Sequence, residues 1–142
     1  MNLSPHFTLA EMTTSQTAAR RRLDNTPPPA VLAALHRTAL GLETVRMLLG
    51  APIVITSGYR SPEVNRAVGG AWNSQHMTGE AADIIVPGYG TPDDVVRKLV
   101  AHKEIPYDQC ILEFDRWVHI SFSASPRHQA LVIDHGGIRA WA

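Results

Sequence analysis

Residues 109–122, QCILEFDRWVHISF, contain the pattern that decides the fold of this chain. Two runs rich in β-branched and aromatic residues, 109–114 and 116–122, meet near the polar pair Asp115-Arg116. Runs of this length and composition on either side of a tight turn predict two paired strands. The C-terminal half of the chain is therefore expected to form a sheet.

The second of these strands has different residue types on its two faces. Because side chains alternate along a strand, Val118 and Ile120 face one side, and Trp117, His119 and Ser121 face the other. The face with valine and isoleucine is expected to join the core, so the histidine projects away from it, where a pocket can form. Taken alone, a histidine in a strand is more often a hydrogen-bonded core or surface group than a ligand.

Outward from the hairpin, the earlier part of the chain is mainly helical. From about Ala30 to Leu49 the apolar residues recur at helical spacing, and Gly50 follows as a C-terminal cap. Further helices are expected at residues 61–70 and 91–103, and further strands at 52–57, 82–87 and within 129–142. The sum is one α+β domain over residues 1–142, with flanking helices, a mainly antiparallel sheet and a motif-bearing core at about 50–123.

Composition excludes several classes of protein. The chain has 142 residues, 44% hydrophobic and 18% charged, and a net charge of zero, which argues against a nucleic-acid or membrane-surface binder. No apolar run approaches the roughly 20 residues that span a bilayer, so stable membrane insertion is not expected. The N-terminus lacks the pattern of a signal peptide. The single cysteine, Cys110, excludes an internal disulfide and is expected to be a buried strand residue.

Three candidate metal ligands fall on or beside predicted strands. They are His76, Asp83 and His119. Two imidazoles and one carboxylate, with a fourth position open, are the ligand set of a catalytic zinc site rather than a structural one. The six residues between His76 and Asp83 fit a loop that turns back into a strand. Read alone, the aspartate is more often a turn or cap residue than a metal ligand.

Three segments together resemble a known family. They are SGYRSPEVNRAVGG (57–70), SQHMTGEAADI (74–84) and WVHIS (117–121). They resemble the zinc peptidases of the D-Ala-D-Ala carboxypeptidase and phage endolysin superfamily, which share the hedgehog/DD-peptidase fold. The matched pattern is Ser-x-His, six residues, Asp, and a later Trp-x-His. The segments FTLAEM (7–12) and DNTPPP (24–29) look like the compact branch found in phages and prophages.

The resemblance implies that one zinc ion is held by His76, Asp83 and His119, and that a carboxylate acts as general base. Many relatives place this acid three residues before the last histidine, where this chain has an arginine. The acids available nearby are Glu113 and Asp115. Glu113 is the first choice, because the arrangement E-F-x-x-W-V-H at residues 113–119 resembles the phage branch, and a hairpin can bring the end of one strand over the middle of the next. Asp115 is the alternative, although turn acids are most often solvated turn formers.

The resemblance also implies roles in substrate binding. Arg60 matches the arginine that binds the substrate carbonyl or carboxylate and stabilises the oxyanion, with a structural salt bridge to Glu63 as the alternative. Ser74 and Gln75 are expected to line the pocket or support the first histidine, unless they only cap the turn. Trp117 is either a substrate platform or a packing residue.

The function that these residues imply is hydrolysis of a peptide bond in the stem peptide or cross-link of bacterial peptidoglycan. One alternative is a D-Ala-D-Ala carboxypeptidase or dipeptidase, and another is a catalytically silent zinc module that binds cell wall or protein. The expected protein is a monomer whose partner is peptidoglycan and not nucleic acid. It is expected to be made in the host cytoplasm and to act on the wall after release, as a phage or prophage lysis enzyme does.

Overall fold

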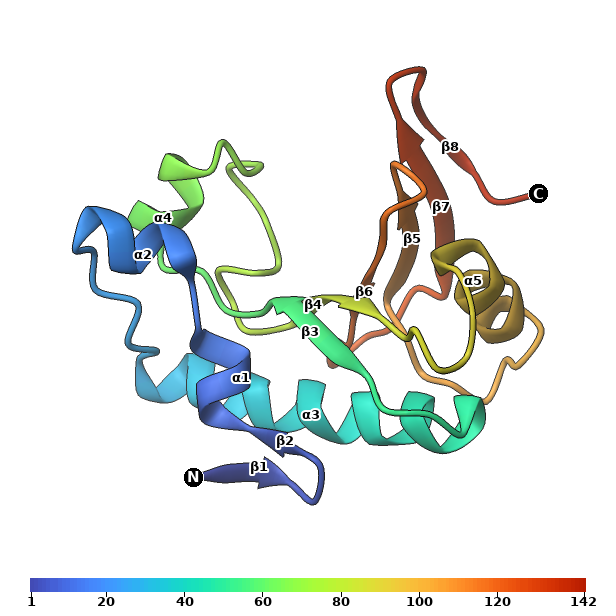
Figure 1. Ribbon diagram of the computed structural model, residues 1–142, viewed down its shortest axis with the longest axis horizontal. Helices are drawn as coiled ribbons and strands as arrows, with labels where there is room; N and C mark the ends of the chain where they lie inside the picture. The colour runs from blue at the N-terminus through green and yellow to red at the C-terminus, as the bar shows by residue number, and fades with distance from the viewer.

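Six strands form the central sheet of the computed structural model, which describes residues 1–142 (Figure 1). In chain order they are β3 (Val54–Ser57), β4 (Ala81–Ile85), β5 (Gln109–Glu113), β6 (Trp117–Ser121), β7 (Gln129–Asp134) and β8 (Gly137–Ala140). Their order across the sheet is β3-β4-β6-β5-β7-β8. All neighbouring strands are antiparallel except β5 and β7, which are parallel. The predicted α+β class and mainly antiparallel sheet are confirmed.

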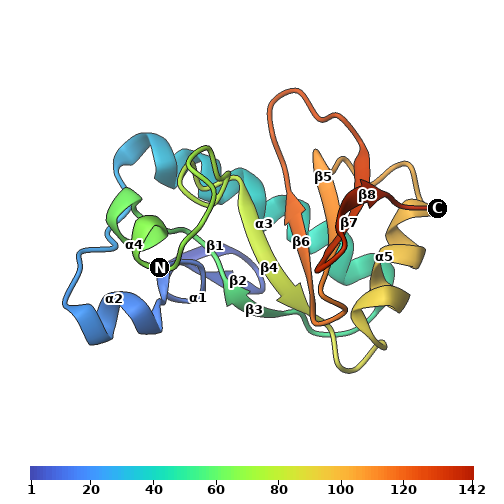
Figure 2. The ribbon, with the colours of Figure 1, turned by 90° about the horizontal axis from the view of Figure 1, so that it is seen from above.

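Five helices and a small two-stranded sheet complete the fold. They are β1 (Asn2–Ser4), β2 (Phe7–Thr8), α1 (Leu9–Thr13), α2 (Gln16–Arg21), α3 (Pro29–Leu49), α4 (Pro62–Ala67) and α5 (Pro92–Val100). Figures 1 and 2 show α2 and α4 together at one end of the molecule, and α5 and β8 at the other, with the long α3 between them. No helix has both the length and the apolar character needed to cross a membrane.

The ends of the helices follow the expected local chemistry. The helix α3 begins after Pro28 and ends at Gly50, whose φ of 66° is the left-handed cap conformation. The helix α5 begins with a capping box, in which the Thr91 side chain accepts from the backbone of Asp94 and the Asp94 side chain accepts from the backbone of Thr91. Both helices were expected at these places.

The core lies on the face of the sheet that α3 and α5 cover. Ile84 on β4 and Val118 and Ile120 on β6 are fully buried and belong to one apolar cluster with Leu35 and Leu42 of α3. The alternation predicted for the second hairpin strand is therefore confirmed on its apolar side. The residues between them, including Asp83 and His119, must point to the opposite face.

The C-terminal tail differs from the expectation of one strand within 129–142. It forms two strands, β7 and β8, joined at His135-Gly136. The turn is possible because Gly137 takes a φ of 107°, which L side chains rarely adopt. The strand β7 extends the sheet by pairing in parallel with β5 in the register Gln109 to Gln129.

Gly41 is the point of closest contact between α3 and the ring of Phe122. A Cβ at this position would lie 2.5 Å from ring carbon Cδ1 and 2.6 Å from Cγ, and the ring is only 2% exposed. Because Cγ is fixed close to the backbone, the ring cannot simply swing away.

We expect Gly41→Ala to lower the free energy of unfolding by about 1–2 kcal/mol. Overpacking costs about 1–3 kcal/mol, and the higher helix propensity of alanine offsets at most about 1 kcal/mol. Urea denaturation measures the change, with Leu40→Ala as the control at an exposed position of the same helix. A variant as stable as the wild type would show that the contact is not tight.

Candidate metal centre

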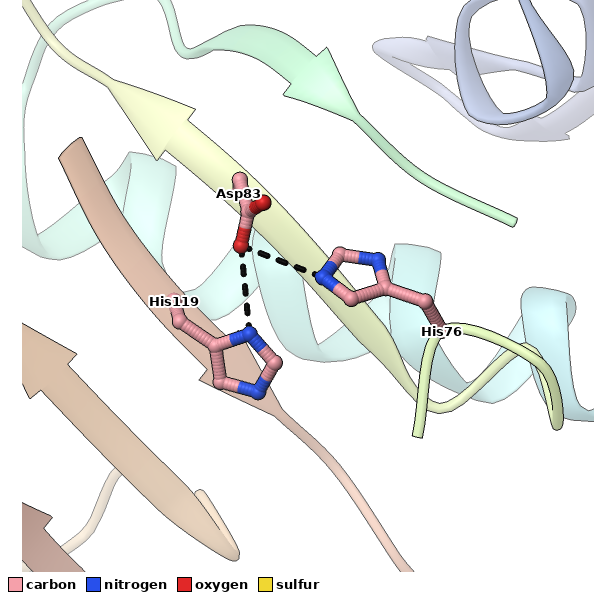
Figure 3. A group of neighbouring side chains, drawn as sticks. All are labelled: His76, Asp83 and His119. Atoms are coloured by element: carbon pink, nitrogen blue, oxygen red, sulfur yellow. Dashed lines mark hydrogen bonds and ion pairs between the residues drawn. The ribbon is translucent and has the colours of Figure 1, made fainter. Parts of the chain in front are cut away.

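Two neighbouring strands and one loop bring three polar side chains together (Figure 3). Asp83 lies in the middle of β4 and His119 in the middle of β6, and the sheet register places them directly opposite each other. His76 comes from the loop between α4 and β4. The possible ligand atoms of the three residues all lie within 4.8 Å of one another. The structure therefore brings together the three predicted ligands.

Both imidazoles point at the same carboxylate oxygen. Asp83 Oδ1 lies 3.2 Å from His76 Nε2 and 3.1 Å from His119 Nδ1 (Figure 3). The two rings meet edge to face at 70°, with their centroids 5.1 Å apart. All three residues are buried, and His76 is only 1% exposed. Buried polar groups that converge on one point in this way are suited to a shared cation.

A hydrogen bond from the ring nitrogen that does not face Asp83 fixes the orientation of His76. Its Nδ1 lies 2.7 Å from the carbonyl oxygen of Gly58. A carbonyl only accepts hydrogen bonds, so Nδ1 carries the proton and donates it, and Nε2 keeps a lone pair directed at the centre. The backbone N–H of Arg60 donates to the carbonyl oxygen of His76 at 3.1 Å. The SGYR segment thus holds this histidine in the tautomer that a metal ligand requires.

Position 58 requires a glycine because the backbone of Met12 lies against it. A Cβ there would collide with the backbone carbonyl of Met12, at the C-terminal part of α1. The N–H of Tyr59 donates to the same carbonyl at 2.6 Å. The N-terminal segment and the SGYR segment are therefore packed together directly behind His76.

The electrostatics of the centre favour a charged Asp83 carboxylate. Burial alone would raise the pKa of Asp83, but its interactions with the His119 and His76 rings outweigh burial and hold that pKa well below its ordinary value. Asp83 is therefore ionised at neutral pH. One carboxylate and two nitrogen lone pairs match the donor set that zinc prefers, so the residues present fit that metal.

The structure separates the two candidate bases. Glu113 Oε1 lies 3.8 Å from His119 Nδ1, and its side chain lines the same cavity as the three ligands. Glu113 reaches the ligands because it pairs with Trp117 across the hairpin. Trp117 lies two positions before His119 and on the same face of β6. Asp115 is in the turn, with a φ of 56°, and does not line this cavity. Burial, and then the charge of Asp83, raise the pKa of Glu113.

The cavity around the centre has a volume of about 650 Å³ and contains the other predicted residues. Arg60, Ser74, Gln75 and Trp117 all line it. Arg60 makes no salt bridge to Glu63, and its Nη2 lies 3.5 Å from Ser74 Oγ. Ser74 Oγ also accepts from the backbone N–H of the first histidine at 3.2 Å, so this serine supports the ligand loop.

Three side chains that line the cavity each carry a buried polar atom without a hydrogen-bond partner in the protein. These atoms are Arg60 Nε, Gln75 Oε1 and Trp117 Nε1. Buried polar groups are normally paired, because leaving one unpaired costs about 1–3 kcal/mol. Two N–H donors and one carbonyl acceptor of these side chains are therefore unused within the protein.

Two residues of this region were missed in the sequence. Asp108 is buried just before β5, and Arg127 lies on the loop before β7 and lines the cavity. Arg127 Nε and Nη2 donate to Asp108 at 2.8 Å and 2.9 Å, and Gln75 Nε2 donates to it at 2.9 Å. Neither residue belongs to a motif, and the 18 residues between them carry no signal of the contact.

The pair formed by Asp108 and Arg127 predicts a change of stability in acid. The hydrogen bonds from Arg127 lower the pKa of Asp108 to about 2, below its value of about 3.9 in an unfolded chain. The pair's contribution is therefore complete above about pH 4 and is lost as the pH falls through about 2. We expect Asp108→Asn to be less stable than the wild type by about 1–2 kcal/mol at pH 6, with Arg127 partly screened by solvent.

This difference is expected to shrink toward zero near pH 2. Urea titrations of both proteins at pH 6, 4 and 2.5 measure it, and the other carboxylates cancel because both proteins contain them. A difference that stays constant over this range would contradict the assignment.

The fold and the site define an α+β domain with a metal-binding centre that opens into a cleft. Residues 5–121 match the peptidase M15 family, and the chain belongs to that family. A segment of 44 residues is 48% identical to the zinc D-Ala-D-Ala carboxypeptidase of Streptomyces albus G. This segment is 30% of the present chain and 17% of the carboxypeptidase, so the match spans about a sixth of that relative. The superfamily resemblance is confirmed, and the phage branch stays a prediction.

Proposed function

We propose that this protein is a zinc-dependent peptidase that hydrolyses a peptide bond in the stem peptide or cross-link of bacterial peptidoglycan. The observation that carries the proposal is the convergence of His76, Asp83 and His119 in one cavity. Glu113 lines the same cavity, and its Oε1 lies 3.8 Å from His119 Nδ1. Membership of the peptidase M15 family supports the reaction class. The partial identity to a carboxypeptidase supports a substrate that contains D-alanine.

The ligands and Glu113 divide the chemistry between them. When bound, zinc lowers the pKa of a water molecule toward 7 and polarises the scissile carbonyl. Glu113 takes a proton from the attacking water as the new carbon–oxygen bond forms. It then donates that proton to the nitrogen of the leaving amine as the carbon–nitrogen bond breaks. The raised pKa of this carboxyl brings it closer to neutral pH, where such an exchange is efficient.

Arg60 completes the site as the group that faces developing negative charge. Its side chain is half-buried, its Nε has no partner, and its Nη2 is held only by a long contact to Ser74. A donor that is unpaired in the resting protein is available to the oxyanion of the scissile carbonyl. An arginine that already had an acidic partner would bind this oxygen less well.

One observation favours a different function. Arg116 occupies the position three residues before His119, where many relatives have an acid. A zinc module without catalytic activity would tolerate the loss of that acid. The position of Glu113 on the cavity wall opposes this reading, because the hairpin supplies a carboxylate at the same centre from another place in the sequence.

Digestion of purified bacterial walls distinguishes these functions. We expect zinc-loaded protein to lower wall turbidity and to release fragments with new amino termini on stem peptides, and a chelator to abolish both effects until zinc is restored. Release of terminal D-alanine alone would identify a carboxypeptidase. A protein that binds zinc and leaves walls and free stem peptides intact would be a silent module.

A further inference from the structure

Asp108 joins two walls of the metal cleft. Its side chain is buried at the start of β5, where its backbone N–H donates to Ser121 and its carbonyl accepts from Gln129. On one side it accepts from Gln75, in the loop that carries the first metal ligand. On the other side it accepts from the side chain and from the backbone N–H of Arg127. The carboxylate therefore fixes a polar group on each side of the cleft.

The two side chains that Asp108 holds, Gln75 and Arg127, both line the cavity and keep unused hydrogen-bonding groups. Because Gln75 donates its Nε2 hydrogen to a carboxylate, its Oε1 is turned away, and that oxygen is buried without a partner. Asp108 occupies the Nε and one Nη2 hydrogen of Arg127, so three of the five guanidinium N–H groups remain. The arginine side chain is 56% exposed and lines the cavity.

The two arginines of the cleft have different surroundings. Arg60 lies in the field of Asp83 and Glu113, at the reacting centre. Arg127 lies on the loop before β7 and lines the cavity with Gln75 and Gln109, and its acidic partner, Asp108, does not line the cavity. A carboxylate that approached Arg127 from the cavity would meet a fixed, planar set of donors, which is the arrangement that binds carboxylates by two parallel hydrogen bonds.

We infer that Arg127, positioned by Asp108, forms a carboxylate-binding subsite of the cleft. The preferred substrate is therefore a peptide with a free carboxylate away from the scissile bond. This inference rests on the proposed peptidase function and specifies its substrate class.

The subsite is tested with two soluble stem peptides. One carries a free carboxylate, and the other carries the corresponding carboxamide and is otherwise identical. Their dissociation constants are measured by calorimetry on zinc-loaded Glu113→Gln protein, in which turnover is suppressed. We expect the acid to bind about five to ten times more tightly than the amide. The effect is moderate because Arg127 is half exposed and Asp108 offsets part of its charge.

Substitution of Arg127 in this background assigns the preference to one side chain. With Arg127→Gln the ratio of the two constants is expected to fall to about one, and with Arg127→Lys to an intermediate value. Arg139→Gln is the matched control, because Arg139 is 57% exposed and bonds to Asp134 at 2.8 Å, outside the cleft. The ratio compares two ligands on the same protein, so a loss of folded material does not change it.

The outcomes separate this inference from the proposed function. Equal affinity for the two peptides, no binding of either, or a preference that survives Arg127→Gln would each overturn the subsite. Acid-selective binding by a protein whose wild type cleaves neither peptide would support the subsite and refute the peptidase. Cleavage of both peptides without acid preference would do the reverse.

Discussion

Asp83→Asn is expected to weaken zinc binding by more than a hundredfold and to lower wall hydrolysis about a thousandfold or more. Asp83 supplies the only negative charge among the three ligands, and its Oδ1 is the atom on which both imidazoles converge. Loss of a partner that only orients a ligand already costs roughly 10–100-fold in affinity or activity, so loss of the anionic ligand itself must cost more. Asparagine keeps the shape, so the loss reports charge rather than packing.

Zinc content and thermal unfolding measure this effect without relying on activity. A ligand present at a thousand times its dissociation constant stabilises a folded protein by about 4 kcal/mol. We therefore expect zinc to raise the melting temperature of the wild type and to leave that of Asp83→Asn nearly unchanged. His36→Ala is the control, because this histidine is exposed and its ring contacts the carbonyl of Leu3 rather than the cluster. Equal zinc responses in wild type and Asp83→Asn would show that the ion binds elsewhere.

The parts of the fold set by local pattern were predictable from the sequence. The helix α3 has an apolar stripe, a proline at its start and a glycine at its end, and each of these signals depends on neighbouring residues alone. The β5–β6 hairpin is equally local, since three residues connect its strands. The alternation of that hairpin placed His119 on the face opposite the core, where the structure has it.

The contacts that close over a long stretch of chain were not predictable. The parallel pairing of β5 with β7 depends on the loop before β7, and nothing in residues 129–134 indicates which strand they will join. The ion pair of Asp108 with Arg127 follows from that pairing, because the register that sets Gln109 beside Gln129 brings the two residues together. Period-2 alternation gives the face of a strand and not its neighbour.

The metal centre was predictable as a set of residues and not as a geometry. The ligand types and the resemblance named His76, Asp83 and His119, but the support behind them depends on backbone contacts. The carbonyl of Gly58 fixes the tautomer of His76, and any residue type has such a carbonyl. The sequence shows only that position 58 is a glycine, which the close approach of the Met12 backbone requires.

Glu113→Gln is expected to lower kcat by about 100- to 10,000-fold with little change in KM. General acid–base catalysis contributes a factor of this size, and the proton transfer occurs in the transition state rather than in the bound substrate. Glu113 is the acid that shares the cavity with the metal ligands. Asp115→Asn is the matched control, because this acid is two residues away and faces outside the cavity, and it is expected to keep wild-type kinetics.

Stability separates loss of the base from loss of the fold. Partial burial, and then the charge of Asp83, raise the pKa of the Glu113 carboxyl, so its charge is unfavourable in the metal-free protein. The neutral isostere removes that repulsion, and we expect Glu113→Gln measured without zinc to be at least as stable as the wild type. An inactive variant that is stable and still binds zinc would identify Glu113 as the base. If instead Asp115→Asn is inactive and Glu113→Gln is not, the base is the turn residue, and if both remain active neither carboxylate accepts the proton.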